Sequence, residues 1–158
     1  GLKFLKQFLQ SQKNNSNKIL FIDPSNKDKI INKKYLKSLR LNKIIQYVAP
    51  IYNKDYTKDL NLLKIITKKK PKYIVINLGG GIQELLGSYL KSNLDYKPSI
   101  ICSGAAISFL TGQQAKIPII FDKIYLGWLV RIIFDPHIFL PRYLNAFKFI
   151  FLMKYINK

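Results

Sequence analysis

The chain has 158 residues, and 48% of them are hydrophobic, including ten Phe and ten Tyr. This length and apolar content suffice for one domain with its own core and argue against intrinsic disorder. The 27 Lys and Arg residues outnumber the 8 Asp and Glu residues, for a formal net charge of +19. Such a positive field favours anionic partners: nucleic acid, acidic lipid headgroups or sugar nucleotides. Because Lys, Asn and Ile are all abundant, we expect most lysines to be plain solvated surface.

The scarce residue types exclude several kinds of site. A single cysteine, Cys102, excludes an intrachain disulfide and is typical of a reducing compartment. Cys102 lies in an apolar, strand-like run, which predicts a buried structural thiol rather than a nucleophile. With one His, one Cys and one Glu, we expect no metal site and no cofactor. No signal peptide is visible, and the apolar runs 124–134 and 143–153 are shorter than the roughly 20 residues that span a bilayer.

The spacing of apolar residues predicts alternating helices and strands. In chain order we expect a helix over 2–12, a strand over 18–23, a helix over 26–40, a strand over 43–48, a helix over 55–69, a strand over 72–78, a helix over 82–93, a strand over 98–103 and a short helix after 106. The side chains expected to face the core from the second and third helices are Ile30, Ile31, Tyr35, Leu39, Leu60, Leu63 and Ile66.

This alternation indicates an α/β fold, a Rossmann-like parallel sheet with flanking helices. From residue 122 onward the alternation stops, and the chain becomes helical, aromatic and basic. We therefore expect two parts, an α/β core over 1–121 and a helical, basic and aromatic C-terminal appendage over 122–158. In sheets of this class, ligands bind at the carboxyl ends of the strands.

Two of those strand ends carry small residues. Gly79–Gly81 follows a strand and precedes a helix, so its backbone N–H groups and the helix dipole favour an anion. Gln83 and Glu84 follow in the first helical turn, where Glu84 can equally well serve only to complement the dipole. Gly104 and Ala105 form the second small-residue turn, which by itself indicates no more than tight packing.

Rare residue types concentrate near the C-terminal end. Residues 125–144 contain the only Trp, Trp128, and two of the three arginines, Arg131 and Arg142. Arginine grips phosphate or carboxylate with a planar fork of donors, which lysine lacks. The stretch therefore indicates contact with an anionic and partly apolar partner.

Taken in order, these fragments resemble the WecG/TagA/CpsF glycosyltransferases, whose pattern is approximately G-x-P-K-Q-E, G-A-A-x-D-F-x-x-G, R-A-P, L-E-W-L-x-R, E-P and R-Y-L. The matching residues are Gly79-x-x-x-Gln83-Glu84, Gly104-Ala105-Ala106-x-x-Phe109-x-x-Gly112, Lys116-x-Pro118, Leu126-x-Trp128-Leu129-x-Arg131, Asp135-Pro136 and Arg142-Tyr143-Leu144. Each fragment alone is unspecific, whereas the ordered set is hard to reach by chance.

Several positions depart from the family pattern. They are Gly81 and Ile82 for Pro-Lys, Ser108 for Asp, Lys116-Ile117 for Arg-Ala, Gly127 for Glu, and Ile138 and Pro141 where arginines are common. The family's Thr/Asn pair, its proposed general base Asp and a pocket Arg belong to a region that would precede Gly1, so we expect this chain to be a piece of a longer protein. The catalytic base of this chain is therefore unknown. None of the carboxylates near the motifs matches the position of the family's base, and these are Glu84, Asp122 and Asp135.

The resemblance implies an inverting, metal-independent hexosyltransferase. It would move an N-acetylhexosamine-type sugar from a UDP-sugar donor to a polyprenol-diphosphate-linked acceptor in cell-surface polysaccharide synthesis, such as teichoic acid synthesis. The implied substrate-binding residues are Gly79, Gly81, Gln83, Glu84, Gly104, Ala105, Lys116, Arg131 and Arg142. The implied location is the cytoplasm, peripheral at the inner face of the plasma membrane, where residues 138–158 would meet an anionic membrane surface. A core helix or a dimer contact is the alternative for 138–158, so a homo-oligomer stays open.

Two other functions compete with this one. A degenerate, non-catalytic relative is favoured by the altered motif positions and by the missing base. A basic nucleic-acid-binding module rests on net charge alone, and the aromatics lie in apolar runs rather than between basic residues as stacking platforms. We therefore expect no nucleic-acid partner.

Overall fold

The computed structural model describes residues 1–52 and 57–114, together with ten separate positions between 129 and 144. The chain divides into two compact units, 1–114 and 115–158. The described positions of the second unit, among them Leu129, Leu140 and Leu144, are helical. The boundary expected between 121 and 122 lies outside the described residues.

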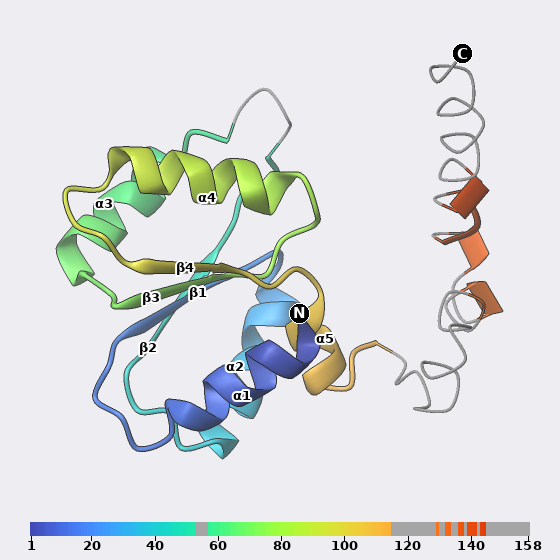
Figure 1. Cartoon of the computed structure of the whole chain (residues 1–158), viewed down its shortest axis with the longest axis horizontal. Helices are drawn as coiled ribbons and strands as arrows, with labels where there is room; N and C mark the ends of the chain where they lie inside the picture. Colours follow the sequence, from blue (N-terminus) through green and yellow to red (C-terminus); the bar gives the residue numbers. More distant parts are fainter. Residues whose placement is uncertain are drawn as a thin grey trace, which may run out of the picture. The chain divides into compact units, whose positions relative to one another are not determined.

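The first unit contains the strands and helices that the sequence predicts, in the predicted order (Figure 1). They are α1 (Leu2–Ser11), β1 (Ile19–Asp23), α2 (Asn26–Ser38), β2 (Ile44–Val48), α3 (Leu60–Lys69), β3 (Tyr73–Ile76), α4 (Ile82–Asn93), β4 (Ser99–Cys102) and α5 (Ala106–Leu110). The largest difference is at the start of α3, which was predicted at residue 55 and lies at Leu60. The helix begins there because Asp59 is its N-cap, and the Asp59 carboxylate accepts the Leu62 N–H. The α/β prediction is confirmed.

All strand pairs of the four-stranded sheet are parallel, in the order β2-β1-β3-β4. The two inner strands, β1 and β3, are the most apolar and the most buried, whereas β2 and β4 form the edges. In this arrangement the carboxyl ends of all four strands point the same way. Below, the carboxyl edge means the ends of β1, β3 and β4 with the residues that directly follow them.

Helices cover both faces of the sheet (Figure 1). Leu20 and Ile22 of β1 pack with α3 and α4 in one apolar cluster. Ile19 and Phe21 of the same strand pack with α1, α2 and α5 in the other cluster. Alternate side chains of one strand thus enter two separate cores, which is why β1 is apolar at four successive positions.

Two of the helical side chains expected to face the core are exposed instead. Ile30 is 68% exposed and Leu60 is 64% exposed, whereas Leu36 and Leu62 are buried in their places. Ile30 lies six residues before Leu36, which puts them roughly 120° apart around the helix. They cannot share the inward face, and the prediction for Ile30 and Leu60 was wrong.

Cys102 also differs from its prediction. It is the last residue of the edge strand β4 and is exposed rather than buried. Its Sγ lies 3.5 Å from the Gln83 carbonyl oxygen, and partial burial, followed by the negative charge of Glu84, raises its pKa. A raised pKa leaves the thiol protonated near neutral pH, so the second half of the prediction, that Cys102 is not an activated nucleophile, agrees with this environment.

Candidate functional site

The two glycine turns predicted from the sequence lie against each other at the carboxyl edge. The link between them is the buried side chain of Gln83, whose Oε1 accepts the Gly104 N–H at 2.8 Å. Its Nε2 donates to Glu84 Oε1 at 2.8 Å. The loop after β3 and the loop after β4 are therefore joined through one amide group, with Ala105 next in the chain.

The first glycine turn, 79–81, is open to its surroundings. Apart from the chain neighbours of each glycine, no atom of the described residues lies within 4 Å of a Cβ placed on Gly79, Gly80 or Gly81. Among the described residues, the backbone N–H groups of Gly79 and Gly80 find no hydrogen-bond acceptor. Gly81 has φ +86°, in the left-handed region that favours glycine, and it precedes α4 directly. Open N–H groups before a helix N-terminus are suited to an anion.

The Glu84 side chain helps to cap the N-terminus of α4, whose N-cap residue is Gly81. Its Oε2 accepts the Gly81 N–H at 2.6 Å, the half of a capping box that a glycine N-cap allows. Its own backbone N–H, then the Gln83 amide, and also the Gly81 N–H lower the pKa of Glu84. The carboxylate is thus charged and already bonded, which agrees with the capping interpretation that the sequence left open.

A buried polar network lies behind the glycine turns, and the sequence prediction missed it. Asp23, the last residue of β1, is 0% exposed. Its Oδ1 accepts Asn32 Nδ2 and Asn77 Nδ2, each at 2.8 Å, and its Oδ2 accepts Gln46 Nε2 at 3.2 Å. Ser103 extends the network, because its hydroxyl donates to Asn77 Oδ1 at 2.6 Å. We call these five residues the Asp23 network.

The Asp23 network joins all four strands. Gln46 is on β2, Asp23 ends β1, and Asn77 and Ser103 directly follow β3 and β4. The sequence contains a signal for this network: the apolar runs of β1, β3 and β4 are each followed or ended by one polar residue, Asp23, Asn77 and Ser103. The pattern does not show that these polar residues meet, because their contacts join strands that are far apart in the sequence.

The chemistry of Asp23 does not suit a catalytic base. Both carboxylate oxygens already accept hydrogen bonds, and the side chain has no exposed surface. Burial raises its pKa, against the hydrogen bonds from Asn77, Asn32 and Gln46, which lower it. A base must reach the proton that it removes, and among the described residues the Asp23 carboxylate contacts its three amide partners, which leave neither oxygen open.

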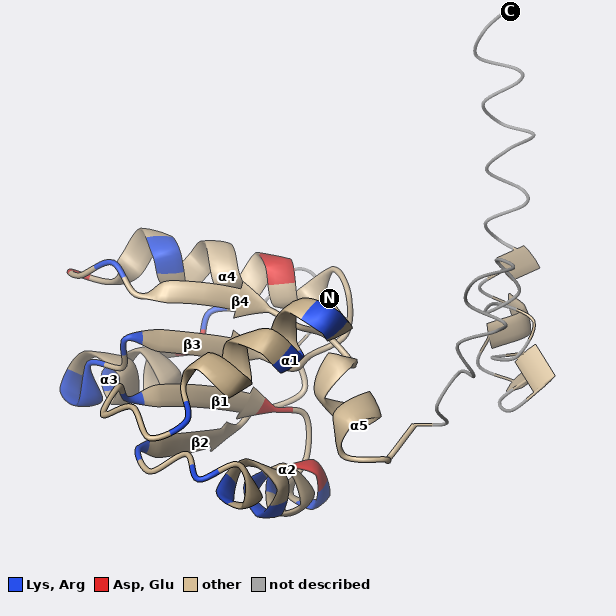
Figure 2. Cartoon of the chain, turned by 60° about the horizontal axis from the view of Figure 1, so that its bottom comes forward, with Lys and Arg blue, Asp and Glu red and all other residues tan. Residues whose placement is uncertain are grey.

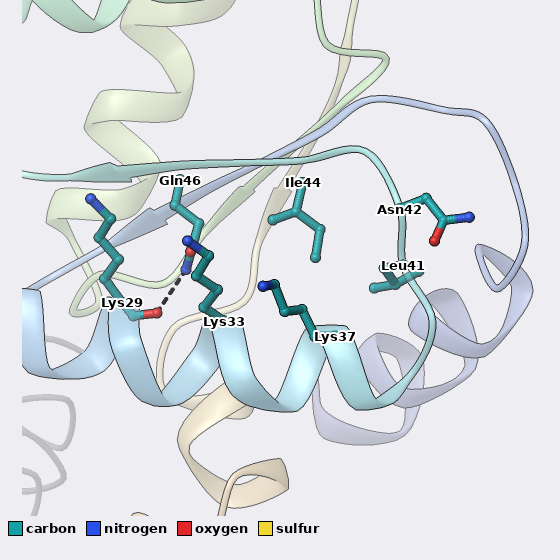
Figure 3. A pocket seen from close by; sticks show the side chains of 7 residues that line it. All are labelled: Lys29, Lys33, Lys37, Leu41, Asn42, Ile44 and Gln46. Atoms are coloured by element: carbon teal, nitrogen blue, oxygen red, sulfur yellow. Dashed lines mark hydrogen bonds between the residues drawn. The ribbon is translucent and has the colours of Figure 1, made fainter.

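A cavity of about 320 Å³ lies between α2 and the edge strand β2 (Figure 3). Three lysines of α2 and four other residues line it, namely Lys29, Lys33, Lys37, Leu41, Asn42, Ile44 and Gln46. Gln46 Nε2 donates to the Lys29 carbonyl oxygen at 2.9 Å. Of the predicted substrate-binding residues that the structure describes, namely Gly79, Gly81, Gln83, Glu84, Gly104 and Ala105, none lines this cavity.

Basic residues are spread over α2, α3 and several loops of the first unit rather than gathered at one place (Figure 2). The three predicted cationic ligands, Lys116, Arg131 and Arg142, lie outside the described residues, as does Trp128. Within the described part of the chain, no group of three or more His, Cys, Asp or Glu side chains is placed to hold a metal ion. Likewise, none of the helices described there is both long and apolar enough to cross a membrane.

A parallel sheet covered by helices, with glycine turns at its carboxyl edge, defines an α/β protein of the Rossmann-like class. The chain matches the Glycosyl transferase WecG/TagA/CpsF family over residues 1–157, and it belongs to that family. No curated protein and no solved structure matches it. The family resemblance predicted from residues 79–144 is confirmed, and the match extends it to nearly the whole chain.

Proposed function

We propose that this chain binds a UDP-sugar at the carboxyl edge and takes part in transfer of an N-acetylhexosamine-type sugar to a polyprenol-diphosphate-linked acceptor. The observation that carries the proposal is the Gln83 bridge between two glycine turns, beside open N–H groups before α4. In a family of glycosyltransferases, such a surface suits the diphosphate of a sugar nucleotide.

The reaction we propose is inverting and independent of a metal. An acceptor hydroxyl attacks the anomeric carbon on the face opposite UDP, a base takes the hydroxyl proton, and UDP leaves with the electron pair of the broken bond. Without a divalent ion, donors must stabilise the charge that develops on UDP. The glycine N–H groups supply part of this, and Lys116, Arg131 and Arg142 are the proposed cationic donors.

A binding measurement tests the donor site. We expect isothermal titration of the full chain with UDP-N-acetylglucosamine in EDTA to give a Kd of about 1 μM to 1 mM, the range of ordinary substrates. Gln83→Ala should weaken binding by about tenfold, because it removes the hydrogen bond to Gly104. Gln114→Ala is the matched control and should leave the Kd unchanged. Equal affinity of both variants would contradict a donor site at the Gln83 bridge.

A second candidate is a non-catalytic relative that binds the donor without transferring the sugar. The specific observation in its favour is that both described carboxylates at the carboxyl edge are engaged, Asp23 by three amides and Glu84 by the α4 N-terminus. Mass spectrometry of a synthetic polyprenol-diphosphate-linked sugar, incubated with chain and donor, separates the two. Transfer supports the enzyme, and donor binding without transfer supports the non-catalytic relative.

We further propose that residues 138–158 contact the anionic inner face of the plasma membrane. The proposal is supported by the apolar and basic sequence of this segment and by Leu140 and Leu144, which are 45% and 55% exposed. Four residues apart, these two leucines share one helical face. Deletion of 138–158 should abolish sedimentation with phosphatidylglycerol vesicles, and unchanged sedimentation would refute the membrane contact. Light scattering of the full chain measures whether it forms a homo-oligomer.

A further inference from the structure

We propose that Asp23 is a positioning residue, whose buried carboxylate holds the two glycine turns of the candidate site in place through Asn77 and Ser103. The consequence for UDP-sugar binding rests on the proposed function. The structural link between Asp23 and the two turns does not, and it can be tested without a ligand.

The first step is the way in which Asp23 orients Asn77. The Asn77 amide places its Nδ2 on Asp23 Oδ1 at 2.8 Å, and this leaves its Oδ1 to accept the Ser103 hydroxyl at 2.6 Å. An amide has one donor end and one acceptor end, so an acceptor at Asp23 fixes which end meets Ser103. The carboxylate thus determines the polarity of the whole connection across β1, β3 and β4.

The second step is the position of these two partners in the chain. Asn77 lies two residues before Gly79, and Ser103 directly precedes Gly104. Asn77 is also held by its backbone, because its N–H donates to the Ile22 carbonyl oxygen at 3.0 Å. Each glycine turn therefore starts from a residue that the Asp23 network holds.

The third step is the cost of burying a carboxylate. The partners of Asp23 are three neutral amides, none of them a basic side chain. An unpaired buried charge is destabilising, and apolar residues of similar volume are generally better tolerated in a core. A buried charge at the end of a central strand, where this fold class binds its ligands, agrees with a role in positioning the site rather than in stability.

The chemistry of the carboxylate adds a dependence on pH. Burial, the largest influence, raises the pKa of Asp23, and the negative charge of Asp28 on α2 raises it further. Two other titratable residues nearby do not bond to Asp23. Lys29 accepts the Gln46 amide with its backbone carbonyl oxygen, and the Tyr47 hydroxyl on β2 donates to Asp59 rather than to Asp23. Protonation of Asp23 turns one acceptor into a donor, which conflicts with the amide donors around it.

The test compares the wild-type chain with Asp23→Asn, which keeps the shape of the side chain and removes its charge. In ligand-free protein, we expect the ¹⁵N–¹H signals of Gly80, Gly81 and Gly104 to shift in Asp23→Asn. Asp28→Asn is the matched control, because it removes a nearby charge and leaves the Asp23 hydrogen bonds in place. Unchanged glycine signals in Asp23→Asn, or equal shifts in both variants, would overturn the proposal.

The affinity for UDP is measured on the same samples. Asp23→Asn should weaken UDP binding by at least about tenfold, since small displacements of positioning groups have effects of this size. Wild-type affinity should fall as the pH falls through the raised pKa of Asp23, and Asp23→Asn should not show this dependence. If wild type and Asp23→Asn bind UDP equally well with the same pH profile, the positioning role is refuted while the donor site stands.

Two further outcomes keep the two proposals apart. If the wild-type chain binds no UDP but the glycine signals respond to Asp23→Asn, the proposed function fails and the positioning link is supported. If Asp23→Asn does not fold, Ser103→Ala replaces it, because that variant leaves all three amide bonds to Asp23 intact. Ser103→Ala should move the signals of Gly80 and Gly81, which it reaches through Asn77, and weaken UDP binding, and the absence of both effects would overturn the proposal.

Discussion

Two buried carboxylates in the first unit are held in opposite ways. Asp23 accepts hydrogen bonds from neutral amides only, and burial raises its pKa. Asp59 is the N-cap of α3, where its Oδ2 accepts the Tyr47 and Tyr52 hydroxyls at 2.7 and 2.6 Å and its Oδ1 accepts the Leu62 N–H at 2.9 Å. Burial acts to raise the pKa of Asp59 too, but these hydrogen bonds outweigh it, and the pKa is lowered.

The difference separates a structural role from a positioning role. A helix N-terminus and two hydroxyls stabilise the Asp59 anion, so its charge contributes to folding. The amides around Asp23 only partly offset burial, so its charge opposes folding while it orients Asn77. We therefore expect variants of Asp59 to change stability and variants of Asp23 to change binding.

The largest effect is expected at Asp59. Asp59→Ala removes the cap of α3 and leaves the Tyr47 and Tyr52 hydroxyls without their acceptor. Together these losses should lower the free energy of unfolding by about 3 kcal/mol, measured by urea denaturation. Asp95→Ala, at an exposed position, is the control and should stay within about 0.5 kcal/mol of wild type. A loss at Asp59 as small as that of the control would remove the contrast between the two carboxylates.

The dependence of stability on pH should have opposite signs for the two residues. The pKa of Asp59 is lowered from 3.8, so its contribution is complete above pH 3.8 and is lost as the pH falls through the folded-state pKa. The pKa of Asp23 is raised from 3.8, so the folded state holds more protons just above pH 3.8 and stability falls as the pH rises there.

Urea denaturation of wild type, Asp59→Asn and Asp23→Asn across this range isolates the two contributions by subtraction. Each unit of pKa difference is worth about 1.4 kcal/mol. Slopes of the same sign for both residues would contradict the assignment of one charge to stability and the other to positioning.

A smaller effect on stability is expected at two glycines with positive φ, Gly104 in the second glycine turn and Gly112 outside both turns. Gly104 and Gly112 have φ of +56° and +76°, so alanine at either position should cost about 1 kcal/mol in unfolding free energy. At Gly104 the new Cβ would only be in ordinary van der Waals contact with the Gln83 amide, at 3.6 Å, but the backbone strain would fall on the N–H that donates to Gln83 Oε1. Gly112 makes no such hydrogen bond to Gln83, and among the described residues no atom lies within 4 Å of a Cβ placed on it. Gly104→Ala should therefore weaken UDP binding while Gly112→Ala should not, which titration of both variants can show. Equal loss in both would place the effect outside the Gln83 bridge.

The smallest effect is expected at Cys102. This residue is exposed at the end of β4, and its raised pKa keeps the thiol protonated. Cys102→Ser should change the unfolding free energy by less than about 0.5 kcal/mol. Reaction with iodoacetamide at pH 7 should be no faster than that of free cysteine, and faster alkylation would indicate an activated thiol.

Local chemistry explains why so many of the helices and strands could be predicted. The apolar strands and the amphipathic helices are short-range patterns, and Gly81 and Glu84 mark the start of α4 by their own backbone and capping chemistry. Helix orientation was less predictable. Ile30 and Leu60 are as hydrophobic as their buried neighbours, and only packing against the sheet selects Leu36 and Leu62 instead.

The features of the candidate site likewise fall into those that the sequence determined and those that tertiary structure decided. Residue types and order alone determined the α/β class, the family resemblance and the two glycine turns at strand ends, because each depends on spacing along the chain. Tertiary structure decided that Gln83 meets Gly104 and that Asp23 meets Asn77, 54 residues further on. Those contacts depend on the strand order β2-β1-β3-β4, which no local pattern encodes, since neighbours in a parallel sheet are set by packing between distant segments.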